Sequence, residues 1–166
     1  MIGRTCHTQD GLPSPGVKGE THAVWSPRAA GMDLHGDMIY SYWDGAKEDF
    51  LPWQRLRWQE LWDGGDVGSL YTSDVCQRLE EADGTILSPV CVPDAEGRGR
   101  AAVMRLRWDG ATLEAVARGN VLTCADERGL HEPSLARCGG RYLMTLRNDL
   151  RAYVAQSTDG LHFNEP

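Results

Sequence analysis

Asp-Gly dipeptides recur along this sequence and constrain its fold more than any other feature. The pair is a strong signal for a tight hairpin turn, because Asp and Gly both tolerate the left-handed backbone that such turns use. Six copies occur, at 10–11, 44–45, 63–64, 83–84, 109–110 and 159–160. β-rich runs lie between several of them, and we expect strands at 85–92, 101–108, 112–117 and 151–156. No helical periodicity persists for the roughly 11 residues that a helix prediction needs, so we expect an all-β fold.

Two sequence patterns repeat at intervals of about 50 residues. The tetrapeptide Arg-Leu-Arg-Trp at 55–58 returns at 105–108. A turn glycine followed by a β-rich strand occurs at 36–42, 84–90 and 140–146. A unit of about 50 residues with four strands is typical of a β-propeller blade, which buries its faces against neighbouring blades. A plain β-sandwich with coincidental spacing is the alternative.

The length of 166 residues limits how many such units the chain holds. At about 50 residues each there is room for roughly three, whereas a propeller needs at least about four blades to close around its axis. We therefore expect one incomplete propeller domain over 1–166, with approximate blades at 20–65, 70–122 and 130–166. The neighbouring blades are expected to be missing from this chain.

Composition and charge exclude several classes of partner. Lys and Arg total 17 and Asp and Glu total 24, which gives a formal net charge of -7. Without a basic block, this balance argues against binding to nucleic acid. No apolar run approaches the roughly 18 residues of a membrane span, and the first residues lack the order of a signal peptide. We expect a soluble chain whose compartment stays open. The five cysteines lack zinc-type spacing, so no metal or cofactor is expected.

The hairpin at 131–148 carries the candidate site. Its turn is Gly-Gly at 139–140, and residues opposite one another in an antiparallel pair have numbers with a constant sum. This rule places Glu132 opposite Arg147, so that a carboxylate and a guanidinium lie side by side. An exposed ion pair without a function is the plain alternative.

The preceding unit shows that a blade does not require this charged pair. Its turn at 83–84 places Cys76 and Cys91 at the equivalent positions. The same geometry makes the two cysteines cross-strand neighbours. A disulfide between them is therefore a hypothesis, provided that their separation suits the bond.

Three segments together resemble the sialidase, or neuraminidase, superfamily. The first is Cys-Gln-Arg-Leu-x-x-x-Asp-Gly-Thr-Ile-Leu-x-Pro at 76–89, and the second is Glu132 fifteen residues before Arg147. The third is Ser-Thr-Asp-Gly-Leu-His-Phe at 157–163, which is similar to a shortened BNR repeat or Asp box, Ser-x-Asp-x-Gly-x-x-Trp. The resemblance covers roughly 71–166. It implies a six-bladed propeller and a retaining glycoside hydrolase that removes terminal sialic, or acidic, sugars by means of a nucleophilic tyrosine.

The resemblance also implies roles for single residues. Glu132 matches the catalytic glutamate that polarises the tyrosine, and Arg147 matches the central arginine of a triad that holds the substrate carboxylate. A planar guanidinium suits a carboxylate, and a carboxylate suits a phenol proton. Gln77 and Asn148, on or beside the axial strands, are expected to contact the glycan, with surface solvation as the alternative. Arg28 is a further substrate-binding candidate, although its surroundings lack the family's Arg-Ile-Pro signature.

The rest of the expected site lies beyond these residues. The resemblance assigns the nucleophilic tyrosine and the third arginine to later blades, so we expect the chain alone to lack sialidase activity. Asp33, Asp37 and Asp44 are acid/base candidates by location only, since turn aspartates are common. Tryptophans are concentrated early in the chain, and packing between blades is favoured over sugar stacking for those at positions 25, 43, 53, 58 and 62.

Two other functions remain open. The first is a five-bladed glycosidase of the arabinanase or fructanase type, in which Glu-Pro-Ser-Leu, a Gly-Arg-Tyr strand and a Ser-x-Asp-Gly turn also appear. Such enzymes use a pair of carboxylates rather than an arginine clamp. The second is a non-catalytic propeller fragment that binds carbohydrate. Arg147 separates the sialidase interpretation from the first alternative, because a guanidinium clamp is useful only for an anionic substrate.

Overall fold

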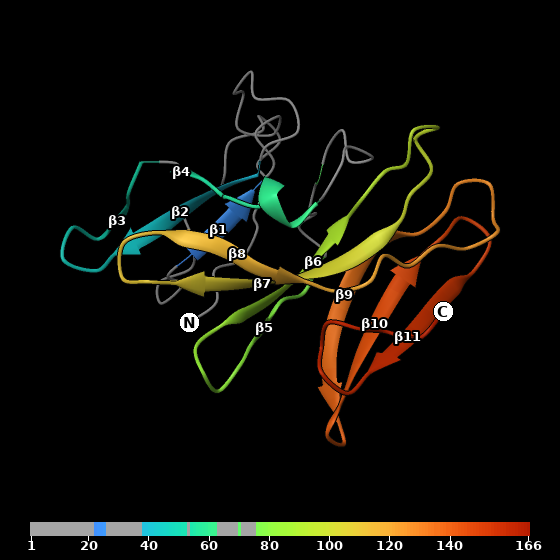
Figure 1. Cartoon of the computed structure of the whole chain (residues 1–166). Coiled ribbons are helices and arrows are strands. Elements are labelled where there is room, and N and C mark those ends of the chain that lie inside the picture. Colours follow the sequence, from blue (N-terminus) through green and yellow to red (C-terminus); the bar gives the residue numbers. More distant parts are fainter. Residues whose placement is uncertain (1–21, 26–37, 53, 63–69, 71–75) are drawn as a thin grey trace.

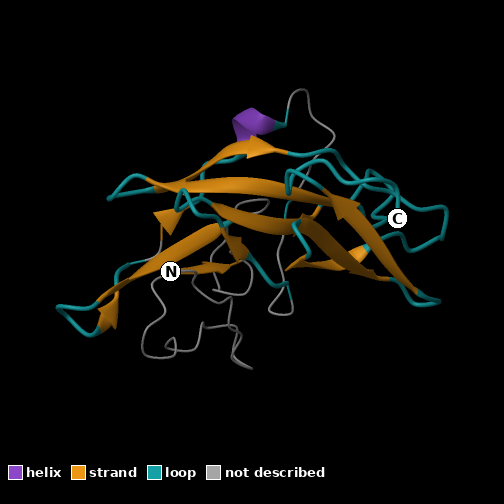
Figure 2. Cartoon of the chain, turned by 90° about the horizontal axis from the view of Figure 1, so that it is seen from below, coloured by secondary structure: helices purple, strands orange, loops and turns teal. Residues whose placement is uncertain are grey.

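A computed structural model describes residues 22–25, 38–52, 54–62, 70 and 76–166 of the chain. This part contains eleven strands and a single three-residue 3-10 helix, η1 (Gln59–Leu61). Figure 1 shows the strands grouped into separate sheets along the chain, and Figure 2 shows them joined by loops, with η1 as a short turn of helix. The expected all-β class is confirmed for the described residues.

The strands form three antiparallel sheets in sequence order. The first has the order β1-β2-β3, with β4 also paired to β2, and its strands are β1 (His22–Trp25), β2 (Ile39–Asp44), β3 (Asp49–Phe50) and β4 (Gln54–Arg55). The second has the order β5-β6-β7-β8: β5 (Leu79–Glu80), β6 (Ile86–Cys91), β7 (Ala101–Trp108) and β8 (Leu113–Arg118). The third has the order β11-β10-β9: β9 (His131–Cys138), β10 (Arg141–Arg147) and β11 (Ala152–Ser157). In the described residues these sheets do not close into a ring.

Strand β6 of the middle sheet is buried on both of its faces. Every residue of β6 is buried, because successive side chains of a strand point to opposite faces and both faces are covered here. Ile86 and Val90 belong to a core shared with the first sheet, where they pack with Tyr40. Leu87 belongs to a second core, where it packs with Met144 of the third sheet. The three sheets are therefore stacked through two separate hydrophobic cores.

The expected strands agree closely with the structure. The predictions for 85–92, 101–108, 112–117 and 151–156 correspond to β6, β7, β8 and β11, with ends that differ by one residue or less. These segments are framed by local turn signals. Their existence could therefore be inferred without knowledge of what packs against them.

The pairing expected for Cys76 and Cys91 is wrong. The turn before β6 is a three-residue loop rather than a two-residue one, because the Glu81 N–H donates to the Thr85 carbonyl over 2.8 Å. The Gly84 N–H in turn donates to the Glu81 carbonyl, and Gly84 is left-handed, with φ of 78°. The register is consequently shifted by one residue from the expected one. Both cysteines are buried and neither forms a disulfide, so the structure contradicts the disulfide hypothesis.

No helix in the described part of the chain has the length and apolar character needed to cross a membrane.

Candidate functional site

A β-bulge in the third sheet brings Glu132 and Arg147 together. The register of β9 and β10 follows the expected constant sum from Cys138 as far as Thr145, which pairs with Ser134. Arg147 then pairs with His131, so two residues of β9 lie opposite one of β10. The backbone partner expected for Arg147 was thus off by one residue. The side chains nevertheless meet, since Arg147 Nη1 donates to Glu132 Oε1 over 2.7 Å.

The backbone at Glu132 is strained. Its φ is 49°, in the left-handed region, although the next residue is Pro133, which favours extended backbone before it. A non-glycine residue in such a conformation costs on the order of 1–3 kcal/mol and persists only where the surroundings enforce it. From this backbone the Glu132 carboxylate accepts its bond from Arg147. Observed strain of this kind is typical of functional positions.

A close contact between two glycines holds the segment that precedes Glu132. The Gly99 N–H donates to the Arg128 carbonyl over 2.8 Å, and the Leu130 N–H donates to the Gly99 carbonyl over 2.7 Å. A Cβ atom on Gly129 would lie 2.1 Å from the Gly99 carbonyl oxygen, so no side chain fits there. This contact fastens the loop between β6 and β7 to the start of the third sheet.

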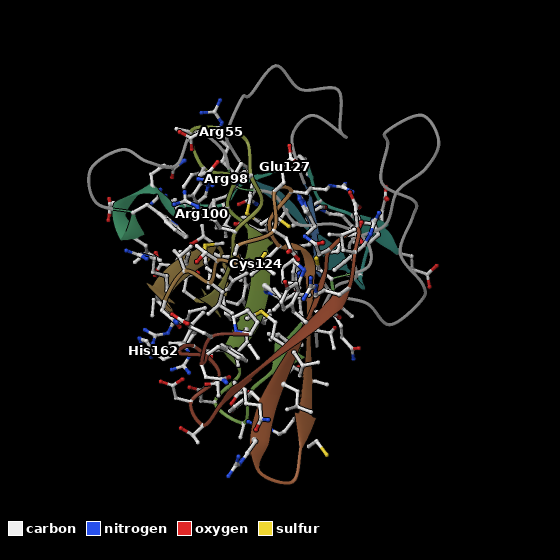
Figure 3. The ribbon with its side chains drawn as sticks, turned by 90° about the vertical axis from the view of Figure 1, so that its right-hand side faces the viewer. Arg55, Arg98, Arg100, Cys124, Glu127 and His162 are labelled. Carbon is white, nitrogen blue, oxygen red and sulfur yellow. The ribbon has the colours of Figure 1, made fainter. Side chains whose placement is uncertain are left out.

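The arginines of that loop are already engaged. Arg98 Nε donates to Asp94 Oδ2 over 2.8 Å, and Arg100 donates to the carbonyls of Val92 and Pro93. Figure 3 labels Arg98 and Arg100 close together on this side of the molecule. The Gly-Arg-Gly-Arg run at 97–100 therefore fastens its own loop and has no strand-loop-helix context for a phosphate.

Glu132 and Arg147 lie at the edge of a surface hollow of about 620 Å³. The hollow occupies the end of the third sheet opposite the turn at 139–140. Its lining combines charged, hydroxyl, amide and a few apolar groups: Glu132, Ser134, Thr145, Leu146, Arg147, Asn148, Asp149, Leu150, Arg151 and Ala152. Such a mixture suits a ligand with many hydroxyl groups and at least one charge.

Charges of both signs alternate around this hollow. Besides Glu132, Arg147 approaches Asp149, with 3.9 Å between Nη2 and Oδ1. Arg128 forms a close ion pair with the same Asp149 oxygen. Arg151 Nε lies 3.5 Å from Asp126 Oδ2. Arginine side chains that remain about half exposed hold such pairs weakly, so a ligand can compete for them.

The other predicted contact residues have different surroundings. Gln77 is exposed on the segment before β5, where its backbone bonds to Ser134 and Leu135 of β9. Asn148 lines the hollow but is buried, and its amide group donates to the Gly129 carbonyl over 2.6 Å and accepts from the Leu150 N–H. The roles of Gln77 and Asn148 in binding a glycan stay predictions.

Of the early acidic and basic candidates, Asp44 alone lies within the described residues, and it does not line this hollow. Arg28, Asp33 and Asp37 lie outside the described residues. Asp44 closes the turn after β2, where its carboxylate accepts the Ala46 and Lys47 N–H groups. These bonds, with the nearby Lys47 ammonium, hold the pKa of Asp44 below its ordinary value. A lowered pKa disfavours a role for Asp44 as a general acid.

The two tryptophans at positions 58 and 62 belong to the first core. Trp58 is buried, and Trp62 is half-buried. The guanidinium carbon of Arg118 lies over the Trp62 ring, 4.6 Å from the ring centre. Both positions fit packing rather than sugar stacking. The side chains at positions 25, 43 and 53 lie outside the described part of the chain.

Two tyrosines donate to carboxylates, yet neither lines the hollow. Tyr142 donates to Glu81 Oε2 over 2.7 Å near the turn at 139–140, at the other end of the sheet. Tyr153 donates to Asp126 Oδ2 over 2.6 Å, and this bond raises the pKa of Tyr153 to about 12. A raised pKa disfavours the phenolate that a nucleophile needs.

The segment after β11 forms a compact turn around Asp159. Asp159 Oδ1 accepts the Leu161 and His162 N–H groups, each over 2.8 Å, and Ser157 Oγ accepts the Gly160 N–H over 2.9 Å. Partial burial raises the pKa of Asp159, but these bonds and the His162 side chain outweigh it and keep the pKa well below its ordinary value. Phe163 closes the turn by entering the second core.

Several residues in or beside the hollow were not anticipated from the sequence: Asp149 and Arg151 line it, and Arg128 is ion-paired to Asp149. Arg128, Asp149 and Arg151 had no motif to mark them, and only the density of charge just after β10 and just before β9 pointed to this region. Their grouping depends on the contact between the loops at 92–100 and 119–130. Within the described residues, no cluster of three or more His, Cys, Asp or Glu side chains has the arrangement of a metal site.

Comparison with known proteins identifies the fold. No protein-family model matches the sequence, and no curated protein matches it. Among solved structures, a Hadza microbial sialidase, Hz136, is similar at a TM-score of 0.56 and 13% identity, over 87% of this chain and 30% of that one. Trypanosoma rangeli sialidase is similar at a TM-score of 0.52 and 18% identity, over 78% of this chain and 22% of that one. The same enzyme in complex with 2,3-difluorosialic acid, a covalent intermediate, is similar at a TM-score of 0.52 and 17% identity, over 75% of this chain and 20% of that one.

The chain thus spans less than a third of the length of these sialidases. At this level of identity the likeness establishes the fold alone. The described sheets have the sialidase-like β-propeller architecture, without closure into a ring. The expected fold class is confirmed.

Proposed function

We propose that this chain is part of a glycoside hydrolase of the exo-sialidase type, which removes terminal acidic sugars from glycans by a retaining mechanism. The observation that carries the proposal is the Arg147–Glu132 pair, 2.7 Å apart at the edge of a polar hollow. The three sheets would be successive blades, with limits near 20–65, 70–122 and 130–166. The sialidase-like fold supports this proposal.

Arg147 would bind the carboxylate of the sugar. Its guanidinium is planar and carries five N–H donors, of which Glu132 takes one in the present geometry. The remaining donors can form two parallel bonds to a carboxylate, which is the strongest and most directional arrangement available to this group. A neutral sugar would gain little from it.

Glu132 would act on a tyrosine as the base that polarises its phenol. The strained backbone and the bond from Arg147 hold its carboxylate in one place, which such a role requires. Tyr142 and Tyr153 are engaged elsewhere, so neither is assigned as the nucleophile. We expect the 166-residue chain by itself to turn over no fluorogenic sialoside.

The turn around Asp159 adds support from outside the hollow. In the sequence it resembles a shortened Asp box, and in the structure its serine and aspartate satisfy successive backbone N–H groups of the loop. It follows β11, at the point where a further outer strand of the blade would begin. Its role would be to fold the blade rather than to bind substrate.

The test is a titration of the chain with sialic acid, followed by NMR, in the wild type and in the variant Arg147→Lys. A lysine keeps the charge but loses the paired donors, so we expect binding at least about fivefold weaker. Arg141→Lys is the matched control, because Arg141 begins the same strand β10 at the far end from the hollow and bonds to Gln156. We expect the control to bind like the wild type.

Two results would decide against this proposal. If Arg147→Lys and the wild type bind sialic acid with equal affinity, Arg147 does not bind the carboxylate of the sugar through paired donors. Binding of a neutral arabinan oligosaccharide in its place would favour the arabinanase or fructanase type.

A further inference from the structure

Asp149 places its carboxylate between two guanidinium groups at the hollow. Its Oδ1 atom forms a close ion pair with Arg128 and lies 3.9 Å from Arg147 Nη2. The two arginines come from different segments, the loop before β9 and the end of β10. One carboxylate oxygen is therefore approached by both cations, which is the environment that an anionic ligand would need.

We propose that the Asp149 carboxylate occupies the position that the carboxylate of a ligand would take. Arg128 and Arg147 then form an anion clamp, a pair of guanidinium groups that becomes available to the ligand when the Asp149 side chain turns away. Asp149 is thus an internal competitor that the ligand displaces. This inference rests on the proposed function for the identity of the ligand as an acidic sugar. It adds Arg128 as a binding residue and Asp149 as the group that controls access.

The turn that carries Asp149 allows such a movement. Asn148 is buried, its side chain bonds to Gly129 and Leu150, and its N–H donates to the Arg151 carbonyl. The backbone on both sides of Asp149 is thereby fixed. The Asp149 side chain itself is 52% exposed, so rotation about its own bonds can carry the carboxylate into water without moving the turn.

The ion pairs that hold Asp149 in place are weak enough to exchange. Arg128 is 48% exposed and Arg147 is 53% exposed, so water screens their attraction to the carboxylate. Arg147 keeps its 2.7 Å bond to Glu132 when Asp149 leaves. The Arg147 half of the clamp therefore stays positioned during the exchange.

The charge balance explains why the exchange selects an anion. With Asp149 inward, Arg128 and Arg147 are matched by Glu132 and Asp149, and the four groups sum to zero. With Asp149 turned outward, one positive charge is left unmatched in the hollow. A carboxylate ligand restores the balance, whereas a neutral sugar leaves the cation unpaired and cannot displace Asp149.

The test compares three probes, namely sialic acid, its methyl ester and propionate, in NMR titrations of the full chain. Asp149→Asn removes the internal charge at nearly constant shape. We expect it to bind sialic acid about threefold to tenfold more tightly, because the ligand no longer competes with two weak ion pairs. The uncharged ester should show no gain.

Two further variants separate this effect from a change in overall charge. Glu48→Gln makes the same change in net charge on the exposed loop between β2 and β3, far from the third sheet (Figure 1), and should bind like the wild type. Arg128→Gln should weaken binding of sialic acid. In that background Asp149→Asn should add little, since one of its two partners is already gone.

The outcomes are distinct. The clamp proposal fails if Asp149→Asn binds sialic acid no more tightly than Glu48→Gln does. It also fails if the methyl ester gains as much affinity as sialic acid. If Asp149→Asn gains affinity for both carboxylates, but sialic acid binds no better than propionate, the clamp stands and the sialidase assignment fails. A gain for sialic acid well above that for propionate supports both.

Discussion

Replacing Gly129 by alanine tests whether the contact between the loops at 92–100 and 119–130 holds the candidate site together. Gly129 has a φ of 79°, and a Cβ atom there would lie 2.1 Å from the Gly99 carbonyl oxygen. Both atoms belong to, or lie directly on, the backbone, so no side-chain rotation relieves the overlap. The variant must separate the two loops.

The expected loss of stability has two parts. Holding alanine in the left-handed region costs roughly 1–2 kcal/mol relative to glycine. Separating the loops also removes the bonds from Gly99 N–H to the Arg128 carbonyl and from Leu130 N–H to the Gly99 carbonyl. At about 0.5–1.5 kcal/mol each, these bonds bring the expected loss to about 2–5 kcal/mol. Most domains have only about 5–15 kcal/mol in total.

Urea unfolding followed by tryptophan fluorescence measures this loss. With a slope of about 2 kcal/mol per molar, the midpoint of Gly129→Ala should fall by about 1–2.5 M. Gly139→Ala is the matched control, because Gly139 is also left-handed, with φ of 57°, but a Cβ atom there would meet nothing within 4 Å. This variant carries only the cost of the backbone conformation, and its midpoint should fall by about 0.5–1 M.

A Gly129→Ala midpoint no lower than that of Gly139→Ala would refute the reasoning, since the contact would then add nothing beyond strain. The site gives a second readout. Because Arg128 and Leu130 flank the substituted residue, separation of the loops should also weaken binding of sialic acid by the folded variant, whereas Gly139→Ala should leave it unchanged.

Two more predictions follow from the turns and the thiols. The pKa of Asp159 is lowered in the folded chain, so its ionised carboxylate stabilises the fold at pH values above 3.8, the ordinary pKa of the group. This stabilisation is lost as the pH falls below 3.8. Asp159→Asn should therefore have a lower urea midpoint than the wild type at pH 7, and the difference should narrow below about pH 4; a constant difference would contradict this. Peptide maps with and without reductant should be identical for the segments that hold Cys76 and Cys91. A peptide in which the two cysteines are linked would contradict the absence of a disulfide between them.

The hairpin at the site shows how far local rules extend. The constant sum set by Gly139 and Gly140 predicts the register of β9 and β10 as far as Thr145, because the turn dictates which backbone groups can meet. It fails beyond that point, at the bulge containing Glu132 and Pro133. The left-handed backbone of Glu132, with φ of 49°, is a departure from regular pairing that the turn sequence does not predict.

The turn at 83–84 shows the opposite case, in which a local detail was misjudged. Asp-Gly marked a hairpin correctly, but the Asp83 carboxylate accepts both the N–H and the hydroxyl of Thr85. This closes a three-residue loop and moves the register by one residue. Because side chains alternate along a strand, such a slip separates the two cysteines that the sequence had paired.

The sequence by itself determined the all-β class, the main strands and the hairpin that carries Glu132 and Arg147, because turn chemistry and alternation act over a few residues. Tertiary structure decided what surrounds that pair. Arg128 and Asp149 are 21 residues apart and meet only where the Gly99–Gly129 contact fastens one sheet to the next. Contacts of this kind depend on packing between distant segments, and no local periodicity records them.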